Sequence, residues 1–162
     1  MVKEESKLEI FKEKYEQLRK KYSLPKFEDI NKDFHIDHSA DVETDLIIIE
    51  VRKHVADKMA GYLRFAETLL NPTNAPMFIF SIIKTLSEED KKELTDVYKK
   101  LAKNELKLIE IDVEFVESKE AEFIKESYNL WQGIKKKILI ILKSVDDKWD
   151  SKFENNNKGY FG

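Results

Sequence analysis

The sequence has no cysteine, little glycine or proline, and no long apolar run. Without cysteine it can form no disulfide, no thiolate nucleophile, and no zinc or iron–sulfur site built on cysteine. Its 4 glycines and 3 prolines provide few positions for tight turns. The most apolar segments, 77–83 and 138–142, are far shorter than the roughly 20 residues that a helix needs to span a bilayer. We therefore expect a helical protein with no membrane-spanning segment and no membrane partner.

The chain also lacks an excess of charge of one sign. Its 29 basic and 32 acidic residues give a formal net charge of -3, so no overall field attracts nucleic acid or an anionic membrane. With 162 residues, of which 41% are hydrophobic, the chain fits one domain with a sufficient core. Residues 1–10 lack the apolar segment of a signal peptide, which predicts a cytoplasmic protein.

The strongest helical pattern covers residues 41–71. Its apolar residues recur every three or four positions and so share one helix face, namely Ile48, Val51, Val55, Met59, Tyr62, Ala66 and Leu69. Ser39 and Asp41 are candidate N-caps, and the two prolines that follow Asn71 end the pattern. We expect the other helices to pack around this one.

Similar spacing predicts further long helices over 3–22, from about 88 onward, and over 118–152, with short helices over 26–33 and from 77. Segment 77–83 is apolar nearly all round, which predicts burial on more than one side. Residues 109–116 alternate like a strand, but no partner strand is evident, so a helix is favoured. The pattern leaves open whether the last two long helices are separate or form one kinked helix.

Together these elements predict an all-α, single-domain bundle over residues 1–152. It would contain about four long and two short helices, mainly antiparallel, followed by a flexible C-terminal tail over 153–162. Ser87, followed by three acidic residues, is the clearest helix start in the chain, because a serine can cap a helix whose first turn is acidic.

All three histidines lie between residues 35 and 54, among many carboxylates. Imidazole and carboxylate are ligands for zinc, iron or manganese, and a metal-dependent hydrolase would use such an ion to activate water. The candidate metal ligands are His35, His38, Glu50 and His54. The helical metal-binding spacings His-Glu-x-x-His and Glu-x-x-His are absent, however. Surface and capping roles are therefore favoured, and we expect no cofactor.

Two basic clusters could contact the phosphates of a nucleic acid or a ribosome. They comprise Arg19, Lys20 and Lys21, and Lys135, Lys136 and Lys137. Three adjacent charges on a helix point in three directions, so each cluster offers only one or two charges to a given surface. This hypothesis ranks second.

The first helix and the C-terminal tail provide candidates for protein interaction. The first helix carries a seam at strict coiled-coil spacing, which includes Leu8, Phe11, Tyr15 and Leu18. Docking of this seam on the chain's own bundle is favoured over a partner helix. The aromatic residues Tyr160 and Phe161 form either a short docking motif or a terminus that folds back on the bundle.

One resemblance extends over most of the chain. The path from Leu70-Asn71-Pro72 through Ser87-Glu88-Glu89-Asp90 to Glu122-Phe123-Ile124-Lys125 and Trp131 resembles small all-helical proteins of unknown function from archaeal genomes. The resemblance implies an all-helical, cytoplasmic protein. It implies no activity, cofactor or catalytic residue.

The sequence favours a non-enzymatic protein-interaction or scaffold module, with a protein partner or self-association. It contains no glycine-rich phosphate loop, nucleophile elbow or catalytic triad motif, and we assign no catalytic residue. A nucleic-acid or ribosome-associated protein is the first alternative, and a metal-dependent hydrolase that uses the histidine-rich segment 33–57 is the second.

Overall fold

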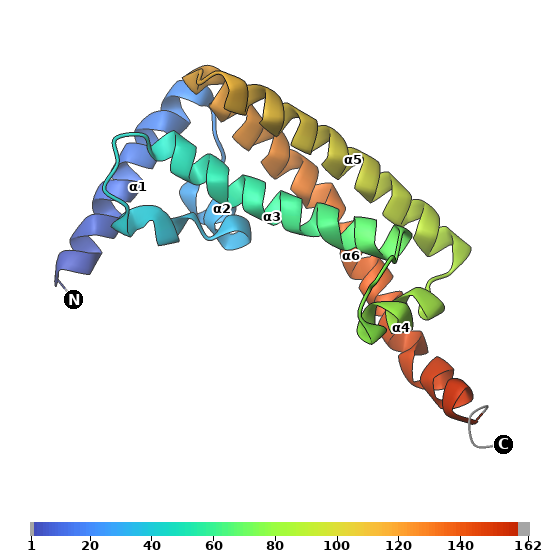
Figure 1. Ribbon diagram of the computed structural model, residues 1–162. Helices are drawn as coiled ribbons and strands as arrows, with labels where there is room; N and C mark the ends of the chain where they lie inside the picture. Colours follow the sequence, from blue (N-terminus) through green and yellow to red (C-terminus); the bar gives the residue numbers. More distant parts are fainter. Residues whose placement is uncertain (1, 159–162) are drawn as a thin grey trace. The chain divides into compact units, whose positions relative to one another are not determined.

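The computed structural model describes the backbone of residues 2–158 and the side chains of residues 6–151, and all its elements are helices. In chain order they are α1 (Val2–Tyr22), α2 (Phe27–Phe34), the 3-10 helix η1 (Ile36–Asp41), α3 (Ile47–Leu70), α4 (Met77–Thr85), α5 (Glu88–Val113) and α6 (Glu117–Lys158) (Figure 1). Within residues 2–158 there is no strand, which confirms the all-α prediction. In that same stretch, no helix is both long and apolar enough to cross a membrane.

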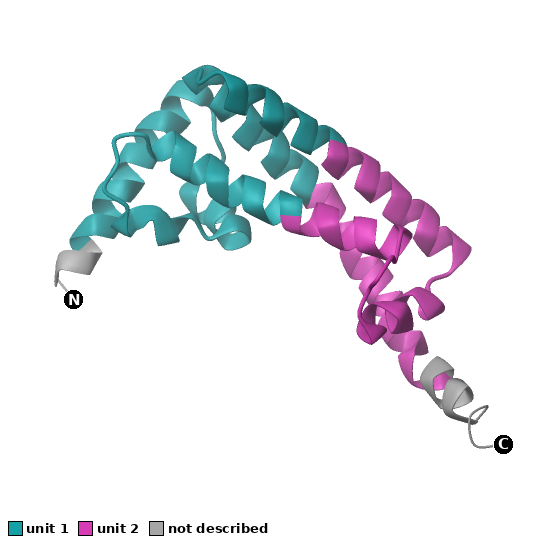
Figure 2. Ribbon diagram, in the orientation of Figure 1, with its two compact units in different colours: residues 1–60, 103–131 teal, residues 61–102, 132–162 magenta. Residues whose placement is uncertain are grey.

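The chain divides into two compact units (Figure 2). Unit 1 comprises residues 1–60 and 103–131, and unit 2 comprises residues 61–102 and 132–162. The boundaries fall inside α3, α5 and α6, so each of these long helices contributes to both units. Whether the two units unfold together is a separate property, and the single-domain expectation stays a prediction.

In unit 1, aromatic contacts hold α1 against α2. The ring of Phe27 lies edge-on to the rings of Phe11 and Tyr15, with centroids 6.1 Å and 5.8 Å apart. The hydroxyl of Tyr15 also donates a hydrogen bond of 2.7 Å to the backbone carbonyl of Pro25. Both Phe11 and Tyr15 are buried. One face of α1 is therefore part of the core of this unit.

Polar contacts join α3, α5 and α6 in the same unit. Arg52 of α3 contacts Asp112 of α5 and Glu120 of α6, at 3.0 Å and 2.8 Å. Glu120 is only 1% exposed, so this ion pair is largely removed from water. Nearby, the buried amide of Asn104 donates a hydrogen bond of 2.7 Å to the hydroxyl of Ser127.

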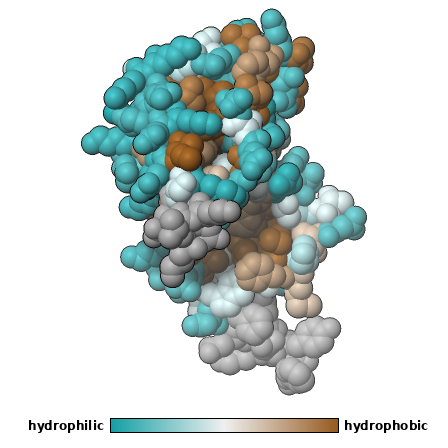
Figure 3. All heavy atoms as spheres, turned by 90° about the vertical axis from the view of Figure 1, so that its left-hand side faces the viewer, coloured by the Kyte–Doolittle hydropathy of each residue, from teal (hydrophilic) through white to brown (hydrophobic). Residues whose placement is uncertain are grey.

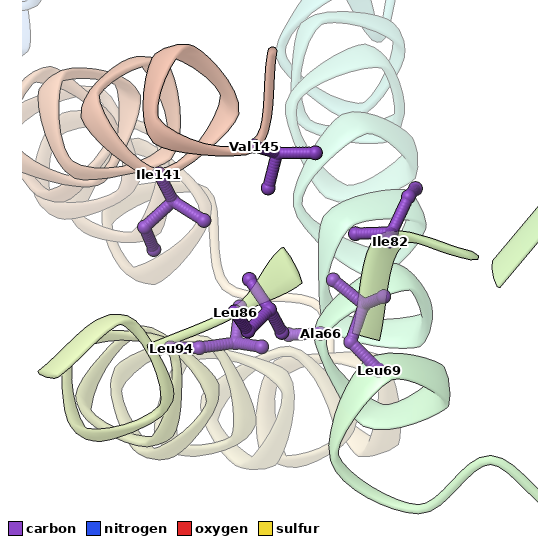
Figure 4. Close-up of a cluster of buried hydrophobic side chains, with 7 residues drawn as sticks. All are labelled: Ala66, Leu69, Ile82, Leu86, Leu94, Ile141 and Val145. Atoms are coloured by element: carbon purple, nitrogen blue, oxygen red, sulfur yellow. The ribbon is translucent and has the colours of Figure 1, made fainter. Parts of the chain in front are cut away.

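Unit 2 has an aliphatic core that α3, α4, α5 and α6 supply together with Leu86, which lies between α4 and α5 (Figure 4). Its buried side chains are Ala66, Leu69, Ile82, Leu86, Leu94, Ile141 and Val145. Lys137 of α6 contacts Asp96 of α5, and Ser144, further along α6, contacts Asp90 near the start of α5. In this unit α5 and α6 therefore run antiparallel.

The central helix begins later than its pattern predicted. Helix α3 starts at Ile47, because residues 36–41 form η1 and Val42 then adopts extended backbone angles (φ -80°, ψ 118°). Ser39 and Asp41 are therefore not its N-caps, and that prediction is wrong. The Ser39 hydroxyl instead lies 2.7 Å from Nε2 of His54. The connector 42–46 that results from this late start forms one wall of the candidate site.

The strand-like segment is helical as far as Val113, and α5 and α6 are separate helices because residues 114–116 interrupt them. Helix α6 continues to Lys158, beyond its expected end near 152. The predicted flexible tail thus begins inside a helix, and its last residues, 159–162, lie outside the described residues.

The prediction that α4 is buried on more than one side is wrong. Met77 is 85% exposed, and Phe78 and Phe80 are also exposed. Only Ile82 and Thr85 of this helix are buried. The run of apolar residues therefore did not indicate how many neighbours the helix has.

Candidate protein-binding groove

A groove runs along α1 in unit 1, between this helix and the connector that leads into α3. Its first part has a volume of about 470 Å³ and is lined by α1 from Lys7 to Lys14 and by residues between Ala40 and Ile47. A second hollow of about 360 Å³ shares Lys14, Asp45 and Ile47 with the first and extends to Lys21 and Glu117. We call the two hollows together the α1 groove.

The spacing of residues in α1 explains the first wall. Lys7, Lys14 and Lys21 are seven residues apart, so they follow one line along the helix. Between them, Ile10 is 50% exposed and Leu18 is half-buried. Helix α1 thus turns its aromatic face to the core and presents the groove with a lysine row beside aliphatic side chains.

The connector supplies the second wall. Because its backbone is not helical after η1, it can run along α1 instead of turning away from it. Val42 and Leu46 are both exposed, and the acidic side chains of Asp41, Glu43 and Asp45 lie around them. In the view from the side of α1, apolar surface is visible among hydrophilic side chains (Figure 3).

Ion pairs link the two walls along the first hollow. Lys7 lies 3.7 Å from Asp41, and Lys14 lies 3.9 Å from Asp45, with all four side chains largely exposed. Exposed pairs of this kind contribute about 0 to 1 kcal/mol each. A partner with suitable charges can therefore replace them at little cost.

The contacts at the far end of the groove are tighter. Glu117 accepts a hydrogen bond of 2.6 Å from the Tyr22 hydroxyl and one of 3.0 Å from the Lys21 ammonium. These two donors hold the pKa of Glu117 below its ordinary value, and the Glu117 carboxylate in turn raises the pKa of Lys21. The end of α1 is thereby fixed to the start of α6.

The structure brings the three histidines together. The rings of His35 and His38 stack at 5.8 Å, and His38 lies edge-on to His54 at 6.4 Å. The fourth candidate ligand, Glu50, contacts Lys53 at 3.1 Å. Among the described side chains, no group of three or more histidine or acidic residues is placed to hold a metal ion. The visible role of His54 is to bind Ser39 and so join η1 to α3.

Each basic cluster engages acidic neighbours. Arg19 binds Glu16 through Nε at 2.8 Å, and Lys21 binds Glu117. Lys137 lies 2.6 Å from Asp96 and 3.0 Å from Glu93. The first cluster belongs to unit 1 and the second to unit 2. These pairings reduce the charge that either cluster presents to a phosphate.

The seam of α1 largely docks within the chain's own fold. Phe11 and Tyr15 are buried, and Leu8 and Leu18 are half-buried, so a partner helix cannot reach the seam as a whole. The other two interaction candidates, Tyr160 and Phe161, lie outside the described residues.

Sequence reasoning did not identify the groove itself. Its exposed aliphatic residue on α1, Ile10, stands next to the seam and not in it. The seven-residue lysine spacing was the available signal on α1. No comparable signal marked Val42 or Leu46, because their exposure depends on where the connector lies.

Comparison of the chain with protein-family models, with curated proteins and with solved structures found no match. The resemblance to archaeal helical proteins therefore stays a prediction.

Proposed function

We propose that the chain is a non-enzymatic protein-interaction module whose α1 groove binds an amphipathic segment of a partner protein. The observation that carries this proposal is the exposure of Ile10, Val42 and Leu46 between a row of lysines and a row of carboxylates. Exposed apolar side chains that gather in a hollow with a polar rim are typical of surfaces that bind other proteins.

The two walls specify the chemistry of the partner. Aliphatic side chains of the partner would pack on the exposed Ile10, Val42 and Leu46. Each Å² of apolar surface that this contact removes from water contributes about 25 cal/mol to the free energy of binding. Acidic side chains would face Lys7 and Lys14, and basic ones would face Asp41 and Asp45. A helix with a narrow apolar stripe between charged flanks meets these requirements.

A pair of variants tests the proposal. Full-length tagged chain and its Ile10→Glu variant are incubated with lysate of the source cells, and retained proteins are quantified by mass spectrometry. A carboxylate at position 10 cannot be buried against the partner without a large cost in free energy. We therefore expect the variant to retain at least tenfold less of the specific partner than the wild type does. Circular dichroism verifies that both proteins are folded.

Ile109→Glu on α5 is the matched control. Ile109 is 56% exposed, close to the 50% of Ile10, and it lies outside the groove. The same charge added there should leave the retained partner unchanged. Equal retention by wild type and Ile10→Glu, or a loss of equal size in both variants, would refute the groove as the binding site.

A further inference from the structure

Helix α5 carries a line of exposed aliphatic residues in unit 1. Leu106, Ile109 and Val113 follow one another at three and four positions, so they share one helix face, and they are 67%, 56% and 84% exposed. We call them the α5 stripe. Single exposed aliphatic side chains are normal on a protein surface, whereas three in one line form a contiguous apolar surface of the kind that binds another molecule.

The contacts of α5 within unit 1 leave the stripe facing away from the core. Asn104 donates a hydrogen bond to Ser127 of α6, and Ile111, seven residues after Asn104, is buried. In a helix with about 3.6 residues per turn, these two positions lie on the side opposite the α5 stripe. The stripe is therefore the outer face of the helix, where another molecule can reach it.

Carboxylates border the α5 stripe on both sides. Glu105 and Asp112 are seven residues apart and follow one line along the helix, on one side of the stripe. Glu110 and Glu114 are four residues apart and follow the other side. Glu105 is half-buried, and the other three are exposed. The exposed Lys103 lies only at the N-terminal end of the stripe.

The border with Glu110 opens into a hollow of about 180 Å³ between α5 and α6. Its charged lining residues are Glu110, Glu122 and Glu126, with Lys107 and Lys119. Lys107 donates a hydrogen bond to Glu126, and this bond, together with the charges of Glu126, Glu122 and Glu110, raises the pKa of Lys107 above its ordinary value. Carboxylates therefore outnumber lysines on this side of the stripe.

The border with Asp112 also keeps a negative charge. Arg52 pairs with Asp112 at 3.0 Å, but the same guanidinium pairs with the buried Glu120 at 2.8 Å. One positive charge is thus shared between two carboxylates, and Glu105 adds a third. Acidic borders on both sides repel nucleic acid and anionic membranes and attract the cationic side chains of a protein.

We propose that the α5 stripe binds a basic amphipathic helix of a partner protein. A narrow line of aliphatic residues on that helix would pack on the stripe, and lysine or arginine on both sides of the line would face the carboxylates. Lys103 restricts these basic residues to the C-terminal part of the stripe. No residue of the stripe lines the α1 groove, so the chain would offer two docking surfaces with different charge requirements.

Two synthetic peptides, titrated with the full-length chain, test the proposal. Both are about 20 residues long, which is sufficient for a helix, and both carry leucines at alternating three- and four-residue spacing. Lysines flank the leucines in one peptide, and glutamates flank them in the other. By fluorescence anisotropy, the chain should bind the basic peptide at least tenfold more tightly than the acidic one, and added salt should weaken this binding.

A matched pair of variants locates the contact. Ile109→Ser removes one aliphatic side chain from the stripe and should weaken binding of the basic peptide about tenfold. Ile10→Ser makes the same change in the α1 groove, at an isoleucine of similar exposure, and should leave this binding unchanged. Failure of this proposal is therefore distinct from failure of the groove.

Charge reversal tests the two borders. Glu105→Lys combined with Glu110→Lys places a lysine on each side of the stripe and should make the chain prefer the acidic peptide. Glu9→Lys combined with Glu13→Lys changes the net charge equally, at exposed positions of α1 that do not line the groove. This control should keep the preference for the basic peptide.

Several results would overturn the proposal. Equal affinity for the two peptides would do so, as would binding that Ile109→Ser does not weaken or that Ile10→Ser weakens as much. A reversed preference in the Glu9→Lys, Glu13→Lys control would assign the effect to overall charge instead of the borders. A chain that self-associates through Ile109 in sedimentation experiments and does not bind the basic peptide would make a second copy the occupant.

Discussion

Arg52 links three helices through one guanidinium group. It pairs with the nearly inaccessible carboxylate of Glu120 and with Asp112, and its own side chain is only 12% exposed. A buried carboxylate that loses its partner keeps the cost of desolvation without the compensating attraction. The pair is therefore expected to matter more for stability than the surface ion pairs of this protein.

Arg52→Met tests this expectation. It should lower the free energy of unfolding by about 3 to 5 kcal/mol, measured by urea denaturation. Lys53→Met, which removes an exposed ion pair with Glu50, is the neighbouring control and should cost less than about 1 kcal/mol. The double variant Arg52→Met with Glu120→Met should recover part of the loss. Equal effects of Arg52→Met and Lys53→Met on the free energy of unfolding would contradict the argument from burial.

His54 makes stability depend on pH. Burial lowers the pKa of His54 below its ordinary value of 6.5, and the neighbouring His38 lowers it further, while Asp57, Glu50 and Asp37 act in the opposite direction. The unfolded chain therefore takes up a proton at a higher pH than the folded chain does. The contribution of His54 is fully present above pH 6.5 and is lost as the pH falls toward the folded pKa.

His54→Gln should accordingly flatten the pH dependence of stability. Urea unfolding at about pH 7.5 and about pH 5.5, on either side of the ordinary histidine pKa, measures this pH dependence. We expect the wild type to lose more stability than the variant between these two conditions. The same loss in both proteins would show that His54 does not titrate differently in the folded and unfolded chains.

At the scale of elements, the start of α5 is capped by residues close to it in the sequence. The hydroxyl of Ser87 accepts a hydrogen bond of 3.1 Å from the backbone N–H of Asp90, and the Asp90 carboxylate accepts one of 3.0 Å from the backbone N–H of Ser87. This reciprocal pair is a capping box, with aspartate in place of the more common glutamate. Ser87 is thus confirmed as a cap.

Ser87→Ala should lower the free energy of unfolding by about 1 kcal/mol, because one N–H group at the helix start loses its acceptor. Ser87→Gly should cost less, since glycine is itself tolerated at this position. Thermal denaturation followed by circular dichroism compares the two. No difference between Ser87→Ala and the wild type would mean that water replaces the hydroxyl without loss.

The sequence was sufficient to predict the helices and insufficient to predict some of their ends. Apolar spacing and the Ser87 cap are local features, and they gave the helical class correctly. The start of α3 was wrong because Ser39 binds His54, fifteen residues away, instead of capping the helix. The burial of α4 was wrong because an apolar run does not specify how many neighbours surround it.

Only the side of α1 that faces the core was predictable from the sequence; the groove on its other side was not. The seam correctly placed Phe11 and Tyr15 toward apolar neighbours, and both are buried in the core. The groove on the other side of α1 depends on the path of residues 42–46, which local sequence does not specify. The histidines do lie close together, but their ring contacts form no metal-binding group among the described side chains.

For the molecule as a whole, the net charge is small, but the positive and negative charges are distributed unevenly over the surface. The formal charge is only -3, yet lysines follow one wall of the α1 groove and carboxylates the other. Surfaces of this kind select partners through complementarity more than through overall attraction. The proposals therefore concern specific protein contacts and not general binding to polyanions.

Site-specific photocrosslinking in the source cells tests the central claim most directly. A photoreactive amino acid at Val42, in the wall of the groove, should capture one discrete protein, and Ile10→Glu in the same chain should abolish the product. The same probe at the exposed Lys92, outside the groove, should not capture that protein. A product that persists with Ile10→Glu, or that forms equally from position 92, would contradict binding in the α1 groove.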